Sequence, residues 1–457
     1  MAVGDVSDVS GRPANWAGNV VFTADRVHRP RTVEELQALV AASERIHALG
    51  TGHSFSRIAD TPGVLVSAAD LPTVIDIDTR RASVKVSAGV RYGELAVRLQ
   101  AAGYALPNLG SLPHIGVAGA CATATHGSGD HNGNLATAVS AIEMVTADGE
   151  LAVLRRGCDG DNGAKPDGDG GFAGAVVGLG ALGVVTSMTL DIVPTFDVRQ
   201  YVYEDLPAAR LNASFEEIFS SGYSVSVFTD WQGPLHNQMW IKRRAGACVA
   251  SPPGQRWMGA RLADGPRHPL PGMPAANCTE QRGSAGPWHE RLPHFRLDFT
   301  PSIGAELQSE YLVPRHLGVA AVEAVAALRD RLAPVLRISE IRTVAADDLW
   351  MSPSYRRDTV GLHFTWIDDM AAVAPATAAI EQRLAPLGAR PHWGKLFGTD
   401  PPAVTAMYER SPDFRALMRR HDAAGKFRNE FIDSYFPPGA VAPRRGRRVY
   451  LWPPPGL

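Results

Sequence analysis

The run Arg45-Ile-His-Ala-Leu-Gly-Thr-Gly-His-Ser-Phe55 passes from a short apolar strand signal into two closely spaced glycines. Glycine can turn the backbone at positive φ, and the N–H groups of such a turn can bind an anion such as a phosphate. The glycine spacing differs from the Rossmann fingerprint, and His53 stands where that motif begins a helix. The run therefore predicts a phosphate-binding turn, with a plain turn at the end of a strand as an equal alternative.

Two more glycine-rich segments follow along the chain. Residues 108–129 read Asn-Leu-Gly-Ser-Leu-Pro-His-Ile-Gly-Val-Ala-Gly-Ala-Cys-Ala-Thr-Ala-Thr-His-Gly-Ser-Gly, and residues 178–186 read Gly-Leu-Gly-Ala-Leu-Gly-Val-Val-Thr. Small side chains of this kind let the backbone lie flat against a large planar ligand. Three such segments in one chain predict a single extended cofactor.

The order of these segments resembles the FAD-linked oxidases of the vanillyl-alcohol oxidase type. Five further motifs resemble the branch of that family that contains aldonolactone and alditol oxidases. They are Asn15-Trp-Ala-Gly-Asn19, Pro287-Trp-His-Glu-Arg291, Glu340-Ile-Arg-Thr343, Pro391-His-Trp-Gly-Lys395 and Gly425-Lys-Phe427. The likeness extends over about residues 15–435.

Strand and helix signals are mixed irregularly along the 457 residues, which predicts an α+β fold rather than a strict βαβ series. The resemblance implies the two-domain vanillyl-alcohol-oxidase-type fold, in which a substrate (cap) domain closes over an FAD-binding domain. The expected divisions are an FAD-binding domain over 1–195, a cap domain over 196–402, a segment returning to the FAD-binding domain over 403–436 and a disordered tail over 437–457.

The resemblance also implies how FAD binds. His53 is expected to join its imidazole covalently to the 8α carbon of the flavin. Taken alone, His53 would rather be a loop histidine with ordinary hydrogen bonds, and the other motifs reverse this preference. The expected cofactor-binding residues are Leu49, Gly50, Thr51, Gly52, His53, Ser54, Phe55, Ser111, Gly116, Gly119, Thr123, Ala124, Thr125, His126 and Val185.

Two later segments read as strands with one polar face. In 336–344, Glu340 and Arg342 stand two positions apart and therefore point to the same side of a strand. In 361–367, His363 and Thr365 alternate with larger apolar residues. Lys395 is expected on a third strand, over 393–397. A sheet with an ordinary solvent-facing side is the alternative explanation.

The kinds of side chain on these strands favour a neutral polyol as the substrate. Glu340 would repel an anion, and its carboxylate can accept hydrogen bonds from neighbouring hydroxyl groups. The resemblance implies a substrate site formed by Ser111, Glu340, Arg342, His363, Thr365 and Lys395. Of these, Arg342, Lys395, Glu340 and His363 are the expected catalytic residues.

The expected reaction is the oxidation of the terminal hydroxyl of alditols such as xylitol or sorbitol. A hydride would pass to flavin N5, two cations would stabilise alkoxide character on the substrate oxygen, and dioxygen would become hydrogen peroxide. A sugar-lactone oxidase or dehydrogenase of the same family is the first alternative. The second is a non-catalytic nucleotide- or carbohydrate-binding protein that retains the fold.

Gly110 precedes the expected substrate-site serine. In the resembling branch, the residue at this point can hinder or permit the approach of oxygen to the flavin, and relatives with alanine there include a dehydrogenase. Because glycine has no Cβ, Gly110 favours an oxidase. A simple structural role in a turn is an equal alternative.

Composition narrows the possible partners. A net charge of −2 gives no overall basic field for nucleic acid, and no uncharged apolar run of 18 residues could cross a membrane. The four cysteines, Cys121, Cys158, Cys248 and Cys278, have no metal-binding spacing. We therefore expect a cytoplasmic monomer without a metal, whose partners are a polyol and dioxygen. The acidic, glycine-rich segment 156–171 is expected to be a surface insertion that binds nothing.

Overall fold

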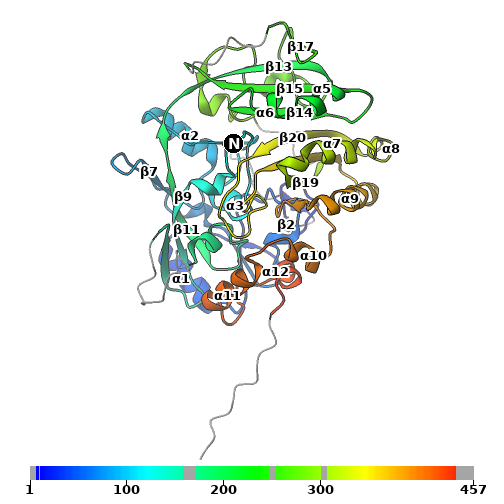
Figure 1. The fold of residues 1–457 in the computed structure, drawn as a ribbon. Helices are drawn as coiled ribbons and strands as arrows, with labels where there is room; N and C mark the ends of the chain where they lie inside the picture. Colours follow the sequence, from blue (N-terminus) through cyan, green and yellow to red (C-terminus); the bar gives the residue numbers. More distant parts are fainter. Residues whose placement is uncertain (1–6, 10, 158–170, 247–253, 300–305, 439–457) are drawn as a thin grey trace, which may run out of the picture.

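The computed structural model describes residues 7–9, 11–157, 171–246, 254–299 and 306–438. The predicted insertion and tail lie outside these ranges, apart from residues 156–157, 171 and 437–438. Helices and sheets are mixed throughout, which confirms the α+β class (Figure 1). The described α-helices are α1 (Val33–Ala42), α2 (Tyr92–Ala101), α3 (Val117–Ala122), α4 (Phe172–Val176), α5 (Ala208–Ala213), α6 (Phe215–Phe219), α7 (Gly318–Ala326), α8 (Arg329–Leu332), α9 (Met370–Leu384), α10 (Pro401–Ala406), α11 (Ser411–His421) and α12 (Glu430–Tyr435). None of them is both long and apolar enough to pass through a bilayer.

The first part of the chain forms small sheets that carry the glycine-rich segments. Among the described residues, three strands pair in parallel: β3 (Val27–His28), β5 (Val64–Val66) and β4 (Ile46–Ala48). Five strands pair antiparallel in the order β10 (Leu151–Arg155), β9 (Val139–Val145), β11 (Val184–Asp191), β7 (Ser83–Ser87) and β6 (Ile75–Asp78). Short pairs are β1 (Ser7–Val9) with β2 (Arg12–Ala14), and β8 (Tyr104–Ala105) with β12 (Val193–Pro194). The glycine-rich turn of residues 50–55 follows β4 directly.

A large antiparallel sheet begins after residue 195. Its described strands, in spatial order, are β16 (Arg256–Trp257), β17 (Ala260–Leu262), β13 (Asp197–Pro207), β15 (Leu235–Arg244), β14 (Ser224–Thr229), β20 (Leu336–Val344), β21 (Thr359–Ile367), β19 (Glu306–Pro314) and β22 (Arg390–Pro391), and β18 (Gly286–Pro287) also pairs with β13. Leu362, Phe364 and Trp366 on β21 are fully buried in the core shared with α7 and α9. Strand alternation therefore turns His363 and Thr365 to the opposite face.

Two contacts join distant parts of the chain. Gly129 N donates to Thr343 O at 2.9 Å, so the second glycine-rich segment is bonded to β20. Near the C-terminus, Ile46 N donates to Lys426 O at 3.0 Å, and Phe427 is buried in the core beneath α1. Figure 1 accordingly shows α11 and α12 at the same end of the molecule as α1. The division at residue 195 and the return of 403–436 stay predictions about domains.

Candidate active site

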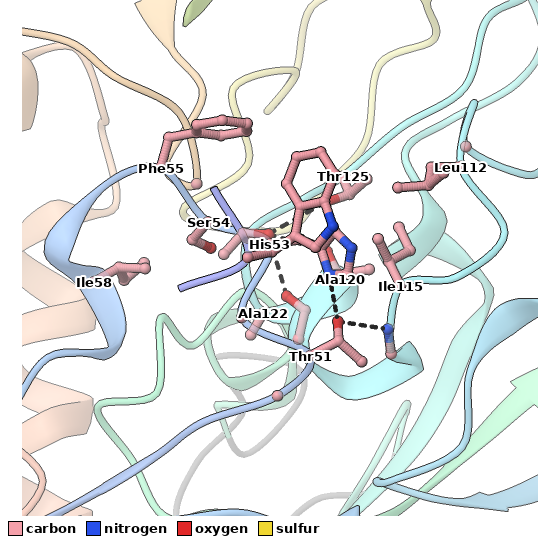
Figure 2. A pocket seen from close by; sticks show the side chains of 18 of the residues that line it. Thr51, His53, Ser54, Phe55, Ile58, Leu112, Ile115, Ala120, Ala122 and Thr125 are labelled. Atoms are coloured by element: carbon pink, nitrogen blue, oxygen red, sulfur yellow. Dashed lines mark hydrogen bonds between the residues drawn. The ribbon is translucent and has the colours of Figure 1, made fainter. Parts of the chain in front are cut away.

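One cavity of about 510 Å³ is lined both by the glycine-rich segments and by strands of the large sheet. Figure 2 shows residues of the first two glycine-rich segments at its wall. The predicted cofactor-binding residues that line it are Leu49, Gly50, Thr51, Gly52, His53, Ser54, Phe55, Ser111, Gly116, Gly119, Thr123, Thr125, His126 and Val185. Ala124 is the exception: its backbone is left-handed, with φ of 55°, and its side chain is buried in the core instead.

His53 is held at one side of this cavity by its own turn. Its Nδ1 lies 3.0 Å from Thr51 Oγ1, which also accepts a hydrogen bond from Gly116 N at 3.2 Å (Figure 2). The indole of Trp16 stacks on the imidazole, with ring centroids 5.2 Å apart. Burial lowers the pKa of His53 to about 3, with Lys395 adding to the effect. The imidazole is therefore neutral near pH 7 and retains one unprotonated ring nitrogen.

Glycines line the cavity wall where the glycine-rich segments meet. A Cβ at Gly50 would lie 3.8 Å from Gly119 Cα and one at Gly116 3.4 Å from Thr51 Cγ2, which are ordinary contacts, and one at Gly119 would meet no atom within 4 Å. Side chains at these positions would therefore take up cavity space rather than clash with the wall. A glycine-lined wall and a neutral histidine fit a large planar cofactor, such as FAD.

In the part of the cavity lined by β20, Arg342 lies between two carboxylates. Its Nη2 donates to Glu310 Oε1 at 2.7 Å, and its Nε lies 3.7 Å from Glu340 Oε2. Its Nη1 lies 3.4 Å from Ser111 Oγ. All three charged side chains are buried, which excludes the alternative that β20 shows its polar face to solvent.

Arg342, Glu310 and Glu340 form a cluster in which each charged side chain stabilises the ionised form of its neighbours. Burial by itself would raise the pKa of Glu340 and of Glu310, but Arg342 beside them holds the pKa of each carboxyl well below its usual range. The two carboxylates likewise raise the pKa of Arg342 against the effect of burial. Both carboxylates and the guanidinium are therefore charged at neutral pH.

Lys395 reaches the cavity from a turn. Residues 393–397 were expected to form a strand, and this expectation is wrong: β22 ends at Pro391, and Lys395 N donates back to His392 O at 3.0 Å. Its Nζ donates to Gln308 Oε1 and lies 5.0 Å from the centre of the Phe55 ring. Burial lowers the pKa of Lys395 to about 8.

Two buried polar atoms of the cluster lack hydrogen-bond partners in the described part of the chain. They are Arg342 Nε and His363 Nδ1. Thr365 adds a hydroxyl on the same face of β21 as His363, and both residues line the cavity. An unsatisfied buried donor or acceptor costs about 1–3 kcal/mol.

The structure adds residues that the motif analysis missed. Glu310 and Gln308 lie on β19 opposite His363 and Thr365, and His392 and His294 also line the cavity. Glu306, Gln308 and Glu310 alternate with Leu307, Ser309 and Tyr311, and this alternation was a signal for Gln308 and Glu310. His294 lies in a loop, and no sequence pattern indicates that it contributes to the site.

Comparisons with known proteins agree with this geometry. Residues 24–155 match the family described as FAD binding domain, and residues 305–435 match the family described as D-arabinono-1,4-lactone oxidase. The crystal structure of cholesterol oxidase from B. sterolicum superposes with a TM-score of 0.73 at 16% identity, covering 95% of this chain and 98% of that one. The protein is thus an FAD-dependent oxidoreductase with the vanillyl-alcohol-oxidase-type fold, as predicted.

Two sequence relatives indicate to which family of FAD-dependent oxidoreductases the chain belongs. Alditol oxidase of a Streptomyces species is 51% identical over 421 residues, which cover 92% of this chain and 97% of the relative. L-gulono-1,4-lactone dehydrogenase of Mycobacterium tuberculosis is 28% identical over 440 residues, with the same shares covered. The chain belongs to the alditol oxidase family.

Proposed function

We propose that this enzyme oxidises the terminal hydroxyl of alditols such as xylitol or sorbitol to the aldose, while dioxygen is reduced to hydrogen peroxide. The observation that carries the proposal is the buried Glu340–Arg342 pair, which opens onto the same cavity as the glycine-rich segments. A carboxylate there disfavours anionic substrates and accepts hydrogen bonds from hydroxyl groups. Bound FAD would take up the hydride and pass the electrons to dioxygen.

The protein's own residues would position and polarise the substrate. Glu340 would accept hydrogen bonds from substrate hydroxyls, and the hydroxyl groups of Ser111 and Thr365, which line the same cavity, would bind others. The positive charges of Arg342 and Lys395 would stabilise the alkoxide that develops as the hydroxyl proton leaves. In a site closed to water, each such interaction is worth about 3 kcal/mol.

For the cofactor, we propose that the residues of the glycine-rich segments bind FAD within residues 1–195 and that His53 bonds covalently to it. A covalent bond from an imidazole needs an unprotonated nitrogen, and the low pKa of His53 supplies one. Residues 196–402 would form the cap, with 403–436 returning to the FAD-binding domain. A monomeric state and a cytoplasmic location stay predictions, to be tested by light scattering and cell fractionation.

The substrate proposal is tested by assaying xylitol, sorbitol and a sugar lactone side by side with detection of peroxide. We expect turnover of both polyols at a higher kcat/KM than of the lactone. Faster oxidation of the lactone would favour the alternative, an aldonolactone oxidase. This alternative is tested because residues 305–435 match a lactone oxidase family. Protein without flavin or peroxide production would contradict both.

The role proposed for Lys395 predicts a pH dependence. Because its pKa is lowered to about 8 and the protonated form stabilises the alkoxide, kcat/KM for xylitol should fall as the pH rises through about 8. Lys395→Met should lower kcat/KM by about a hundredfold and remove this limb of the profile. The measurement is kcat/KM from about pH 6 to about pH 9.5. A wild-type profile that stays flat through this range would contradict the assignment.

Gly110 is expected to control the reaction with oxygen. Its φ is not positive, and an added Cβ would meet no atom closer than 3.8 Å, so neither backbone strain nor packing requires a glycine. Gly110→Val should slow peroxide formation several-fold and leave reduction by xylitol under nitrogen unchanged, as followed by the loss of flavin absorbance. Gly110→Ala should form peroxide at a rate between that of Gly110→Val and that of the wild-type protein. If both steps slowed equally, Gly110 would have no specific role toward oxygen.

A further inference from the structure

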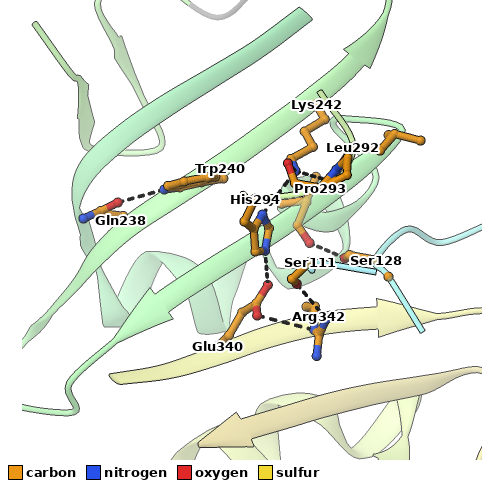
Figure 3. Close-up of polar contacts among 12 residues, drawn as sticks. Ser111, Ser128, Gln238, Trp240, Lys242, Leu292, Pro293, His294, Glu340 and Arg342 are labelled. Carbon is orange, nitrogen blue, oxygen red and sulfur yellow. Dashed lines mark hydrogen bonds and ion pairs between the residues drawn. The ribbon is translucent and has the colours of Figure 1, made fainter. Parts of the chain in front are cut away.

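A fully buried lysine lies behind the substrate site. Lys242 on β15 is 1% exposed, and its Nζ donates to the carbonyl oxygens of Leu292 and Pro293 and to Nδ1 of His294 (Figure 3). Burial lowers the pKa of Lys242 to about 7, and the three partners match the three N–H donors of its ammonium form. None of them is a carboxylate, which is unusual for a buried charge.

His294 connects Lys242 to Glu340 in the substrate site. Its Nδ1 lies 3.2 Å from Lys242 Nζ, and its Nε2 lies 2.9 Å from Glu340 Oε1 (Figure 3). The rings of Trp240 and Phe228 pack against the imidazole, with centroids 5.1 Å and 5.5 Å away. The imidazole therefore has little freedom to turn, and only its two nitrogens make polar contacts.

Glu340 and Lys242 together decide which ring nitrogen carries the proton. The ionised carboxylate of Glu340 can only accept, so the single proton of a neutral imidazole stands on Nε2, and Nδ1 accepts from Lys242. Burial lowers the pKa of His294 to about 4, so the ring is neutral near pH 7. Nε2–H accordingly donates to the carboxylate of Glu340, which is a charge-assisted hydrogen bond.

We propose that Lys242 is a positioning residue for the substrate: through His294 it fixes the orientation of Glu340, so that Oε2 of this carboxylate faces the polyol and Arg342. The inference rests on the proposed alditol oxidation. It adds two residues, Lys242 and His294, to the determinants of polyol affinity. Neither belongs to the set that the sequence motifs marked.

Lys242 could instead serve only to hold the loop that contains His294. That loop is bonded elsewhere as well: Thr279 Oγ1 donates to Pro293 O at 2.8 Å, and His294 N donates to Ser111 O at 3.0 Å. Thr279 thus holds the same loop without touching the imidazole nitrogens or Glu340. It provides a matched control for a purely structural role.

The test compares steady-state kinetics with xylitol for flavin-loaded wild-type enzyme and four variants. We expect Lys242→Met and His294→Leu to raise KM about tenfold, the effect of losing one charge-assisted hydrogen bond, with kcat within about threefold of wild type. His294→Gln can still accept from Lys242 and donate to Glu340, so its KM should stay within about threefold of wild type. Thr279→Val should lower the thermal unfolding midpoint and leave KM unchanged.

Two results would overturn the inference. One is a KM within threefold of wild type in either Lys242→Met or His294→Leu, each folded and flavin-loaded. The other is an equal rise in KM in His294→Gln and His294→Leu, or in Thr279→Val, because the loop rather than the proton position would then explain the effect. The proposed function fails separately, if wild-type enzyme produces no peroxide from xylitol.

Discussion

Arg342→Met should lower kcat/KM for xylitol by about a thousandfold, the largest kinetic effect expected in this enzyme. The change removes the positive charge proposed to stabilise the alkoxide, which is worth about 3 kcal/mol. It also leaves Glu310 and Glu340 buried without the guanidinium that lies 2.7 Å and 3.7 Å from them. Breaking a buried ion pair in this way costs about 3–5 kcal/mol, and one carboxyl is then expected to take up a proton. The measurement is peroxide production over a range of xylitol concentrations.

Arg342→Lys is the control for this experiment. Lysine keeps the charge but cannot contact both carboxylates and Ser111 at once, because an ammonium lacks the planar fork of a guanidinium. Its activity should therefore fall between those of Arg342→Met and wild type. Flavin content and the circular dichroism spectrum establish that each variant is folded. A folded, flavin-loaded Arg342→Met enzyme within tenfold of wild type would disprove the proposed role of the cation.

His53→Ala should abolish covalent attachment of the flavin. After acid precipitation, wild-type polypeptide should stay yellow, whereas the variant should release all of its flavin into the supernatant. The physical basis is the neutral imidazole at the cavity wall, the nucleophile proposed for the bond to the 8α carbon. The cavity and the glycine-rich segments persist in the variant, so FAD should still bind reversibly.

Thr51→Val is the matched control for His53→Ala. It removes the hydroxyl that lies 3.0 Å from His53 Nδ1 but keeps the imidazole, so attachment should persist. Colour that stays with the precipitated His53→Ala polypeptide would mean that another residue carries the flavin. If wild-type protein released all of its flavin, covalent attachment would be disproved, whereas the oxidase function could still hold.

Local patterns in the sequence predicted much of the site. The family resemblance supplied the set of substrate residues, and strand alternation accounts for the position of four of them: on β20 and β21 it turns Glu340, Arg342, His363 and Thr365 to one face, where they line the cavity. The glycine-rich turn after β4 likewise follows from residue order alone. Predictions of this kind succeed where a repeat of two residues along one strand decides which way a side chain points.

Features that depend on distant contacts were not predictable. Lys395 was expected on a strand, but the chain turns after Pro391, and Gly394 O accepts a hydrogen bond from Phe55 N at 2.8 Å. Ala124 has a left-handed backbone that turns its side chain into the core. His294 approaches Glu340 only because its loop folds over β15 onto Ser111. Each of these positions is decided by partners far away in the chain.

The hydrogen bond between Gly129 and Thr343 has a consequence for how this family can diversify. It fixes β20 lengthwise against the second glycine-rich segment, so the distance from Glu340 and Arg342 to the cofactor is built into the backbone. Gln308 and Thr365 face each other on β19 and β21 of the same sheet, two residues along from the pair formed by Glu310 and His363. Substitution at Thr365 should therefore change the preference for polyol length and leave the charged pair in place, whereas Gln308 is constrained because it binds Lys395.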